Sequence, residues 1–244
     1  MSTNFKKASS NSKPLDPLYD KKLTCMYCER VFTSKQVRTS KTRVVKQDSD
    51  YCTYYEGENP IFYEAFVCPY CGFAFTKSFS PLSPGKRDII EKDYIRKLKN
   101  VPNLCGKRTY EEAIRALNLA ALSSYLKGEN DSITGNLFLR IAWLYRYVEE
   151  TEKERIMMEK ALRFYEQAYQ KGDSRQSVIS EHQLLYLMGD LHTRLDHYEE
   201  AAKIFSRLFS DRSVPPKIRA RATETWNKYK NTADKLNDTL QQKE

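Results

Sequence analysis

The stretch "FVCPYCGFAF" (66–75) contains a Cys-Pro-Tyr-Cys tetrad, which is either a redox dithiol or one half of a metal site. A second pair, "CMYC" (25–28), precedes it, with 39 residues between the two pairs. Zinc in structural sites takes four ligands arranged as a tetrahedron, and each Cys-x-x-Cys turn presents two thiolates to one ion. We therefore expect one structural zinc ion per chain, bound by Cys25, Cys28, Cys68 and Cys71.

The residues that follow the second pair argue against the redox alternative. A thioredoxin-like dithiol lies at the N-terminus of a helix, because the helix dipole there lowers the pKa of the thiol. Here the chain continues as "GFAFTKSFSP" (72–81), which is aromatic, favours strand and has no amphipathic helical pattern. Gly72 suits the positive φ that lets backbone N–H groups point at the sulfurs, and Glu29 takes the equivalent place after the first pair.

The segment around the cysteines, residues 21–80, is expected to form a small zinc-ribbon-like β unit. It holds five of the six cysteines and is rich in aromatic and β-branched residues, which favour short strands. The long spacer between the pairs is predicted to be a hairpin insertion. Residues 1–20 are polar and lack the apolar stretch of a signal peptide, so we expect a disordered lead and a cytoplasmic protein.

From residue 86 to 240 the sequence has helical periodicity, after the breaker-rich junction "SFSPLSPG" (78–85). The stretch 184–209 resembles a tetratricopeptide repeat, whose two antiparallel helices need small residues where their backbones approach. Gly189 and Ala201 lie twelve residues apart there, and Phe205 follows. The predicted fold is α+β: the small zinc-ribbon-like β unit followed by an all-α domain of tetratricopeptide-like helical hairpins.

The run from Cys25 to Phe75 resembles a bacterial family called domain of unknown function 2225. Members of that family combine two Cys-x-x-Cys knuckles, a basic strand, an acidic turn such as "DSD" (48–50) and an aromatic block with a C-terminal helical-repeat region. The resemblance implies that the four paired cysteines are zinc ligands. It implies no established activity.

The chain is basic, with a formal net charge of +9, which makes nucleic acid a possible partner. The stretch "SKQVRTSKTRVVK" (34–46) has five positive and no negative residues. The alternative function is nucleic-acid binding. In it, this expected strand contacts the phosphates, and the bases stack on the neighbouring aromatic rings. The basic residues concerned are Lys35, Arg38, Lys41, Arg43 and Lys46. No apolar stretch is long enough for a transmembrane helix, which needs about 18 or more residues.

A second candidate binding face lies in the helical half. Tyr186, Asp190 and Arg194 recur at four-residue intervals and so share one face of a helix. Such faces commonly recognise an extended peptide or a partner helix in stacked-hairpin proteins, although a solvated surface has the same pattern. We therefore expect a protein or peptide partner and no membrane partner.

The remaining reactive residues lie between the two cysteine pairs. Asp48 and Asp50 are either carboxylates of a second metal or catalytic site, or turn residues that pair with nearby basic side chains. Cys52 is either a buried apolar side chain or a spare thiol for redox sensing. No phosphate loop, nucleophile elbow or metalloprotease signature occurs. The sequence predicts a non-catalytic zinc-binding adaptor that binds its partner in a helical-repeat groove. Nucleic-acid binding is the second prediction, and the third is a thiol redox sensor in which the paired cysteines release zinc on oxidation.

Overall fold

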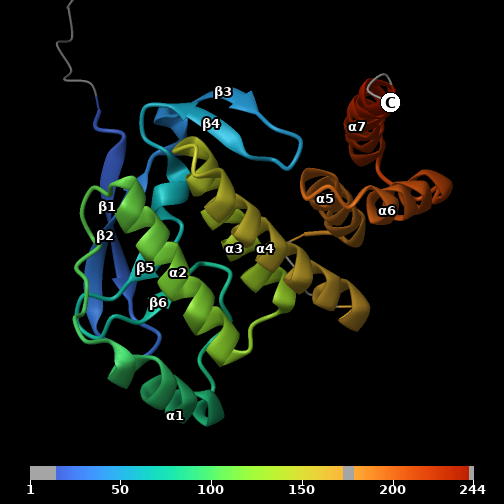
Figure 1. Cartoon of the computed structure of the whole chain (residues 1–244). Coiled ribbons are helices and arrows are strands. Elements are labelled where there is room, and N and C mark those ends of the chain that lie inside the picture. The colour runs from blue at the N-terminus through green and yellow to red at the C-terminus, as the bar shows by residue number, and fades with distance from the viewer. Residues whose placement is uncertain (1–14, 173–178, 242–244) are drawn as a thin grey trace, which may run out of the picture.

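The computed structural model describes residues 15–172 and 179–241, with side chains described up to residue 230 (Figure 1). Antiparallel strand pairs come first along the chain and helices follow, which confirms the predicted α+β class. The strands are β1 (Leu18–Thr24), β2 (Val31–Val37), β3 (Arg43–Gln47), β4 (Thr53–Glu56), β5 (Phe66–Val67) and β6 (Ala74–Phe75). The α-helices are α1 (Pro84–Asp93), α2 (Tyr110–Lys127), α3 (Asp131–Tyr147), α4 (Thr151–Lys171), α5 (Glu181–Arg194), α6 (Tyr198–Ser210) and α7 (Pro216–Gln241).

Each Cys-x-x-Cys pair lies in the turn of its own hairpin. The ladder between β1 and β2 ends at the pair Thr24–Val31, so the first two cysteines occupy the turn. The short ladder between β5 and β6 ends at Val67–Ala74 and leaves the second two cysteines in the same position. Strand β1 begins at Leu18, three residues before the predicted start of the β unit. Residues 1–14 of the predicted disordered lead lie outside the described residues.

The expected single basic strand over 34–46 is divided in the structure. β2 ends at Val37, a 3-10 turn follows at Thr39–Lys41, and β3 then pairs with β4 in a separate sheet. The β3–β4 ladder shifts register between Val44 and Lys46, which places a bulge at Val45. A bulge on an exposed strand discourages pairing with another chain. The five basic residues therefore belong to two strands of different sheets and the turn between them.

Helix α2 has distinct start and stop residues, and the α5–α6 hairpin has the small residue that a close helix–helix contact requires. α2 begins with a reciprocal capping box between Thr109 and Glu112 and ends at Gly128, whose φ is +73°. α5 and α6 form one hairpin, in which a Cβ on Gly189 would lie 3.0 Å from the ring of Phe205. This close approach is the role that the repeat pattern predicted for Gly189.

The β segment and the helices share one continuous hydrophobic core. Arg108, which is buried just before α2, donates to the carbonyl oxygens of Phe62 (2.6 Å) and Ala65 (2.8 Å). Burial lowers the pKa of Arg108 to about 10. The Ser123 hydroxyl on α2 donates to the carbonyl of Ala74 in β6. Within the described ranges, none of the helices has the length and apolar character needed to cross a bilayer.

Candidate functional site

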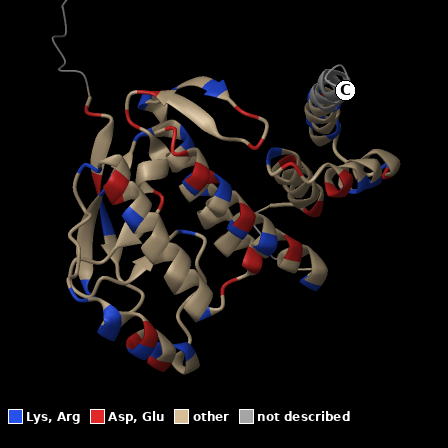
Figure 2. Cartoon of the chain, in the orientation of Figure 1, with Lys and Arg blue, Asp and Glu red and all other residues tan. Residues whose placement is uncertain are grey.

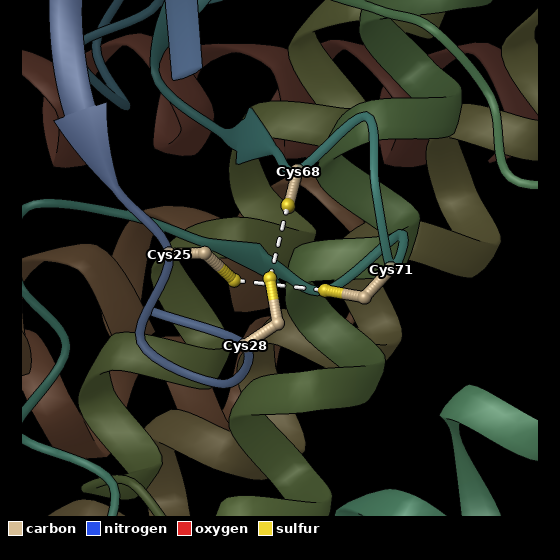
Figure 3. A group of neighbouring side chains, drawn as sticks. All are labelled: Cys25, Cys28, Cys68 and Cys71. Carbon is tan, nitrogen blue, oxygen red and sulfur yellow. Dashed lines mark hydrogen bonds between the residues drawn. The ribbon is translucent and has the colours of Figure 1, made fainter. Parts of the chain in front are cut away.

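The four cysteines of the two hairpin turns come together in one cluster (Figure 3). Their sulfur atoms all lie within 4.8 Å of one another. The Sγ atoms of Cys25 and Cys71 are 3.6 Å apart, as are those of Cys28 and Cys68. Each of these short contacts joins one hairpin to the other, so the cluster connects segments that are about 40 residues apart in sequence.

The thiol cluster fits a tetrahedral metal ion. With a zinc–sulfur distance of about 2.3 Å, the edges of a regular tetrahedron of sulfurs measure roughly 3.8 Å, close to the distances observed here. A disulfide needs about 2.05 Å between sulfurs, and all six cysteines of the chain are free thiols. Cys25, Cys28, Cys68 and Cys71 are therefore the residues that can hold a metal. Four protein ligands complete the shell, which is typical of a structural site.

The backbone of both turns is shaped around the sulfurs. Gly72 has a φ of +77°, as the sequence predicted, and Glu29 takes the same place in the first turn with a φ of +61°. The backbone N–H of Tyr27 points at Cys25 Sγ, 3.4 Å away. A Cβ on Gly72 would lie 2.6 Å from Leu98 Cδ1, so a larger residue would have to displace the Leu98 side chain as well as adopt a positive φ.

The thiols are electrostatically unequal without a metal. A hydrogen bond with Cys71 lowers the pKa of Cys25 to about 6, and the same contact raises the pKa of Cys71. Burial raises the pKa of Cys68 to about 11. Deprotonating all four groups therefore requires a compensating positive charge, which a divalent ion supplies.

Aromatic side chains enclose the cluster and join it to the helices. Tyr94, at the end of α1, is 1% exposed, and its hydroxyl donates to the carbonyl of Gly72 (2.8 Å). Its ring packs edge-on against Phe73, which in turn contacts Tyr27 from the first turn. Tyr94 was not among the site residues predicted from the sequence. The available signal was an aromatic residue at the C-terminal end of a predicted helix.

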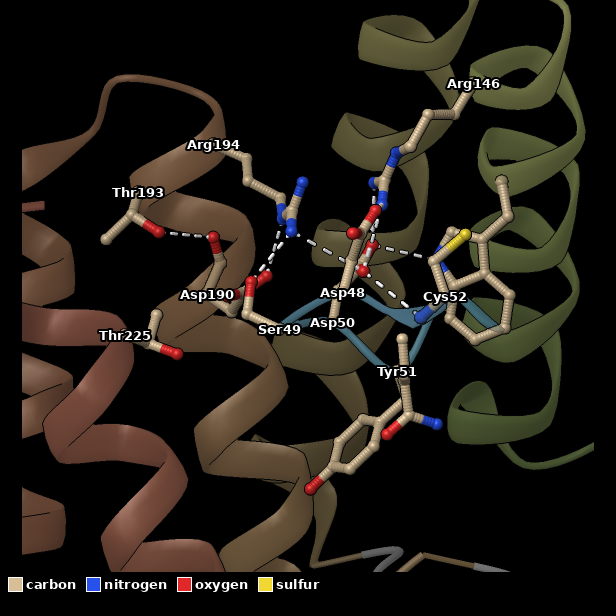
Figure 4. Close-up of polar contacts among 12 residues, drawn as sticks. Asp48, Ser49, Asp50, Tyr51, Cys52, Arg146, Asp190, Thr193, Arg194 and Thr225 are labelled. Carbon is tan, nitrogen blue, oxygen red and sulfur yellow. Dashed lines mark hydrogen bonds and ion pairs between the residues drawn. The ribbon is translucent and has the colours of Figure 1, made fainter. Parts of the chain in front are cut away.

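The face predicted to bind a partner is covered by the chain's own β3–β4 turn (Figure 4). Tyr186 and Asp190 are fully buried, and Arg194 is largely buried. The Tyr186 hydroxyl donates to the carbonyl of Ser49 (2.7 Å), and Arg194 donates to the Ser49 hydroxyl (2.7 Å) and to Asp190 (2.7 Å). The expectation of an open groove at these three residues is therefore corrected, because their polar groups are paired inside the molecule.

Asp50 is the centre of this contact and has no exposed surface. Its carboxylate accepts from both terminal nitrogens of Arg146 (3.0 and 2.7 Å) and from the indole N–H of Trp143 (2.8 Å), and it lies 3.6 Å from Arg194. Burial by itself raises the pKa of Asp50, but Arg194 and Arg146 outweigh it and hold the pKa below its usual range. Asp48 binds Lys46 and Arg146. The carboxylates are thus turn residues in ion pairs, and their main partners are on helices instead of neighbouring strands.

A residue in an unfavourable conformation completes the turn. Tyr51 has a φ of +68°, in the left-handed region that costs a non-glycine residue about 1 kcal/mol. Its ring packs edge-on against Tyr186, with centroids 5.6 Å apart, and the Arg221 guanidinium of α7 lies 4.2 Å above it. These contacts with α5 and α7 offset the backbone cost and fix the turn against the helices.

The two cysteines outside the cluster are structural. Cys52 is fully buried, and burial raises its pKa to about 11, so its thiol is neutral and unreactive at neutral pH. Cys105 donates weakly to the carbonyl of Val67 (3.7 Å). The position of Cys52 therefore agrees with the simpler interpretation, in which it is a buried apolar side chain.

The five basic residues of the 34–46 stretch do not form a continuous positive surface. Three of them are in ion pairs, and the Arg38 guanidinium lies 4.7 Å above the ring of Tyr19. The ion pairs are Lys35–Asp20 (2.9 Å), Arg43–Glu56 (3.2 Å) and Lys46–Asp48 (2.8 Å). Figure 2 shows the same mixture elsewhere, with charges of both signs interspersed along α1 and α4.

Comparison with known proteins gives a family and no described relative. No curated protein and no solved structure matches the chain. Residues 18–229 match the family described as "Uncharacterized protein conserved in bacteria" (DUF2225), from the first strand into the last helix. The match covers both cysteine pairs and the helical half. The chain therefore belongs to this bacterial family, which confirms the resemblance found in the sequence.

Proposed function

We propose that the protein is a non-catalytic zinc-binding protein that acts by binding another protein. The observation that carries this proposal is the cluster of four free thiols, from two separate turns, within 4.8 Å of one another. A zinc ion with four thiolate ligands has no open position for water or substrate, and it stabilises the fold by joining two turns. Six free thiols also support a reducing compartment, and we place the protein in the cytoplasm.

The partner surface that the structure supports best lies on α2, α3 and α4. Tyr125 and Leu122 on α2 are 66% and 45% exposed. The ring of Tyr125 packs edge-on against Phe164 of α4, which stacks on Phe138 of α3. We call these four residues the three-helix patch. An apolar patch that crosses several elements is typical of a protein-binding surface.

Charge indicates the kind of partner. The Lys160 ammonium lies 5.6 Å above the ring of Phe138, at the rim of the three-helix patch. Among the described residues, no acidic side chain forms an ion pair with Lys160. A partner segment with apolar side chains and an acidic group would fill the patch and neutralise this lysine. We therefore propose an acidic, amphipathic protein segment as the ligand.

Two measurements test the proposal. Metal analysis of the purified protein should find about one zinc ion per chain, with four thiols protected from alkylation until a chelator is added. Each protein captured from the host should then be purified and titrated against this protein to measure its affinity. Replacing Leu122 and Tyr125 together by serine should lower the affinity for a true partner by at least about tenfold.

The matched control is Val45→Ser, because Val45 is as exposed as Tyr125 but lies on the β3 strand. This control should leave affinity unchanged. Equal binding by the double variant and the original protein would remove the three-helix patch from the proposal. If the purified protein contains no metal and is still stably folded, the proposal of a structural zinc ion is wrong.

The two alternative functions have less support. Nucleic-acid binding by the 34–46 stretch is disfavoured because Lys35, Arg43 and Lys46 are already neutralised by carboxylates. The aromatic block next to it supplies core side chains instead of a stacking platform, as in Tyr63 and Phe66. A redox sensor in which Cys52 takes part is disfavoured because that thiol is buried and its pKa is raised to about 11. A sensor in which the paired cysteines release zinc on oxidation stays a prediction.

A further inference from the structure

A cavity of about 270 Å³ lies where the β segment meets α3. Gln36 of β2, the loop residues Thr76–Ser78 after β6, and Asn136 and Arg140 of α3 line it. Its volume is slightly below the range of small-molecule pockets, about 300–1,000 Å³, so only a small ligand fits. The zinc cluster and the three-helix patch contribute no residue to this cavity.

Arg140 offers unused hydrogen-bond donors to the cavity. Its Nε donates to both oxygens of Glu64 (3.3 and 3.1 Å), and its guanidinium lies 4.1 Å above the Trp143 ring. Across the described part of the chain, its two terminal nitrogens have no hydrogen-bond partner. These nitrogens carry four of the five N–H groups of a guanidinium, in a planar arrangement that suits a carboxylate or phosphate.

Positive charge is also in excess at the cavity mouth. Lys77 is exposed and lines the cavity. Lys21 of β1 is a neighbour of Lys77: burial, and after it the positive charge of Lys77, lowers the pKa of Lys21. In residues 15–172 and 179–241, neither lysine forms an ion pair with an acidic side chain. Glu64, the only acidic residue among the described residues that line the cavity, already binds Arg140, so the cavity attracts anions.

One amide and two apolar side chains define which other groups a ligand would need. Gln36 donates to the Tyr63 carbonyl (3.3 Å), while its Oε1 is buried without a partner among the described residues. A buried acceptor of this kind needs a donor, at a cost of about 1–3 kcal/mol when it has none. Ile133 and Leu137 of α3 form an apolar wall.

We propose that this cavity binds a small organic anion with a hydroxyl group and a short apolar part. Its carboxylate or phosphate group lies between Arg140 and Lys77, its hydroxyl donates to Gln36 Oε1, and its carbon chain contacts Ile133 and Leu137. The site requires neither the proposed zinc nor the proposed protein partner.

Trp143 reports on the site because Arg140 packs on its ring, and replacing the chain's other tryptophan, Trp226→Phe, isolates the signal. The probes are 3-hydroxybutyrate for the carboxylate, 3-hydroxypropyl phosphate for the phosphate and 3-hydroxybutyramide as the neutral analogue. Fluorescence titration, repeated by calorimetry, should show saturable binding of at least one anion. The neutral amide should bind at least about tenfold more weakly.

The decisive variant is Lys77→Glu, with Lys203→Glu on the outer face of α6 as the matched control. Both lysines are exposed, so both variants should keep the original melting temperature. Lys77→Glu should lower the affinity for the anion by at least about tenfold, and Lys203→Glu should leave that affinity unchanged. The proposal is overturned by the absence of saturable binding with both anions, by equal binding of the amide, or by equal affinities of the two variants.

Discussion

Replacing Asp50 with alanine should destabilise the protein by about 3 kcal/mol. The buried carboxylate accepts two hydrogen bonds from Arg146, one from Trp143 and one from the backbone N–H of Cys52 (3.2 Å). Removing one member of a buried ion pair typically costs about 3–5 kcal/mol, because the remaining charge and donors lose their partner. The alanine variant leaves the Trp143 indole and the Cys52 N–H without that acceptor.

The lower end of this range applies because the other charges are partly compensated. Arg146 keeps Asp48 (3.0 Å) and Glu154 (2.7 Å) as partners. The charge of Asp50 also contributes, after burial, to the raised pKa of Asp190, so its removal relieves one repulsion. For a chain of this size, about 3 kcal/mol corresponds to roughly 6–12 °C in melting temperature.

Urea unfolding followed by circular dichroism measures the free energy of unfolding directly. The matched control is Glu56→Ala, which removes a carboxylate from the same hairpin but breaks an exposed pair with Arg43. This control should cost at most about 1 kcal/mol. If Asp50→Ala costs no more than Glu56→Ala, the turn does not hold the helices together and the reasoning is wrong.

Three further predictions concern the metal, one glycine and pH. Cys28→Ser should lose the bound zinc and lower the melting temperature, and a chelator should reproduce both effects in the original protein, measured by metal analysis and calorimetry. Gly72→Ala should lower the free energy of unfolding more than Gly57→Ala. Both glycines have a positive φ, but of the two only the Cβ added at Gly72 would have side chains within 4 Å. Urea unfolding of both variants therefore separates the steric cost from the backbone cost. The pKa of Asp50 is lower in the folded state, so its stabilisation is present above about pH 4 and is lost as pH falls through the folded-state pKa. Melting temperatures at pH 3 and 6 should therefore differ less in Asp50→Asn than in the original protein.

Local sequence patterns were sufficient for the metal cluster and the helices. The spacing within each cysteine pair predicts a turn, and the preference of a tetrahedral metal ion for four thiolates predicts that the two distant turns meet. Gly189 and Phe205 were informative because a close helix–helix contact restricts residue type at a fixed spacing. In each case the constraint acts either within a few residues or through one ion.

The β3–β4 turn could not be placed in this way. Tyr186, Asp190 and Arg194 form a polar stripe, and polar stripes usually face water. Here they face Ser49 and Asp50, which precede them by well over 100 residues, so periodicity contains no information about the pairing. The sequence feature that distinguishes the two cases is complementary charge, since a buried arginine requires a buried carboxylate somewhere in the chain.

The positions of the four-cysteine cluster and the Asp50 network explain why the β segment and the helices form one core. The cluster joins the β1–β2 and β5–β6 turns beside α1, through Tyr94 and Gly72. The Asp50 network joins the β3–β4 turn to α3 and α5. Arg108 fixes the segment between these contacts to the start of α2. Because residues 18–80 are attached to four helices in this way, losing the metal should loosen the α1 and α2 contacts first and then expose the core that both halves share.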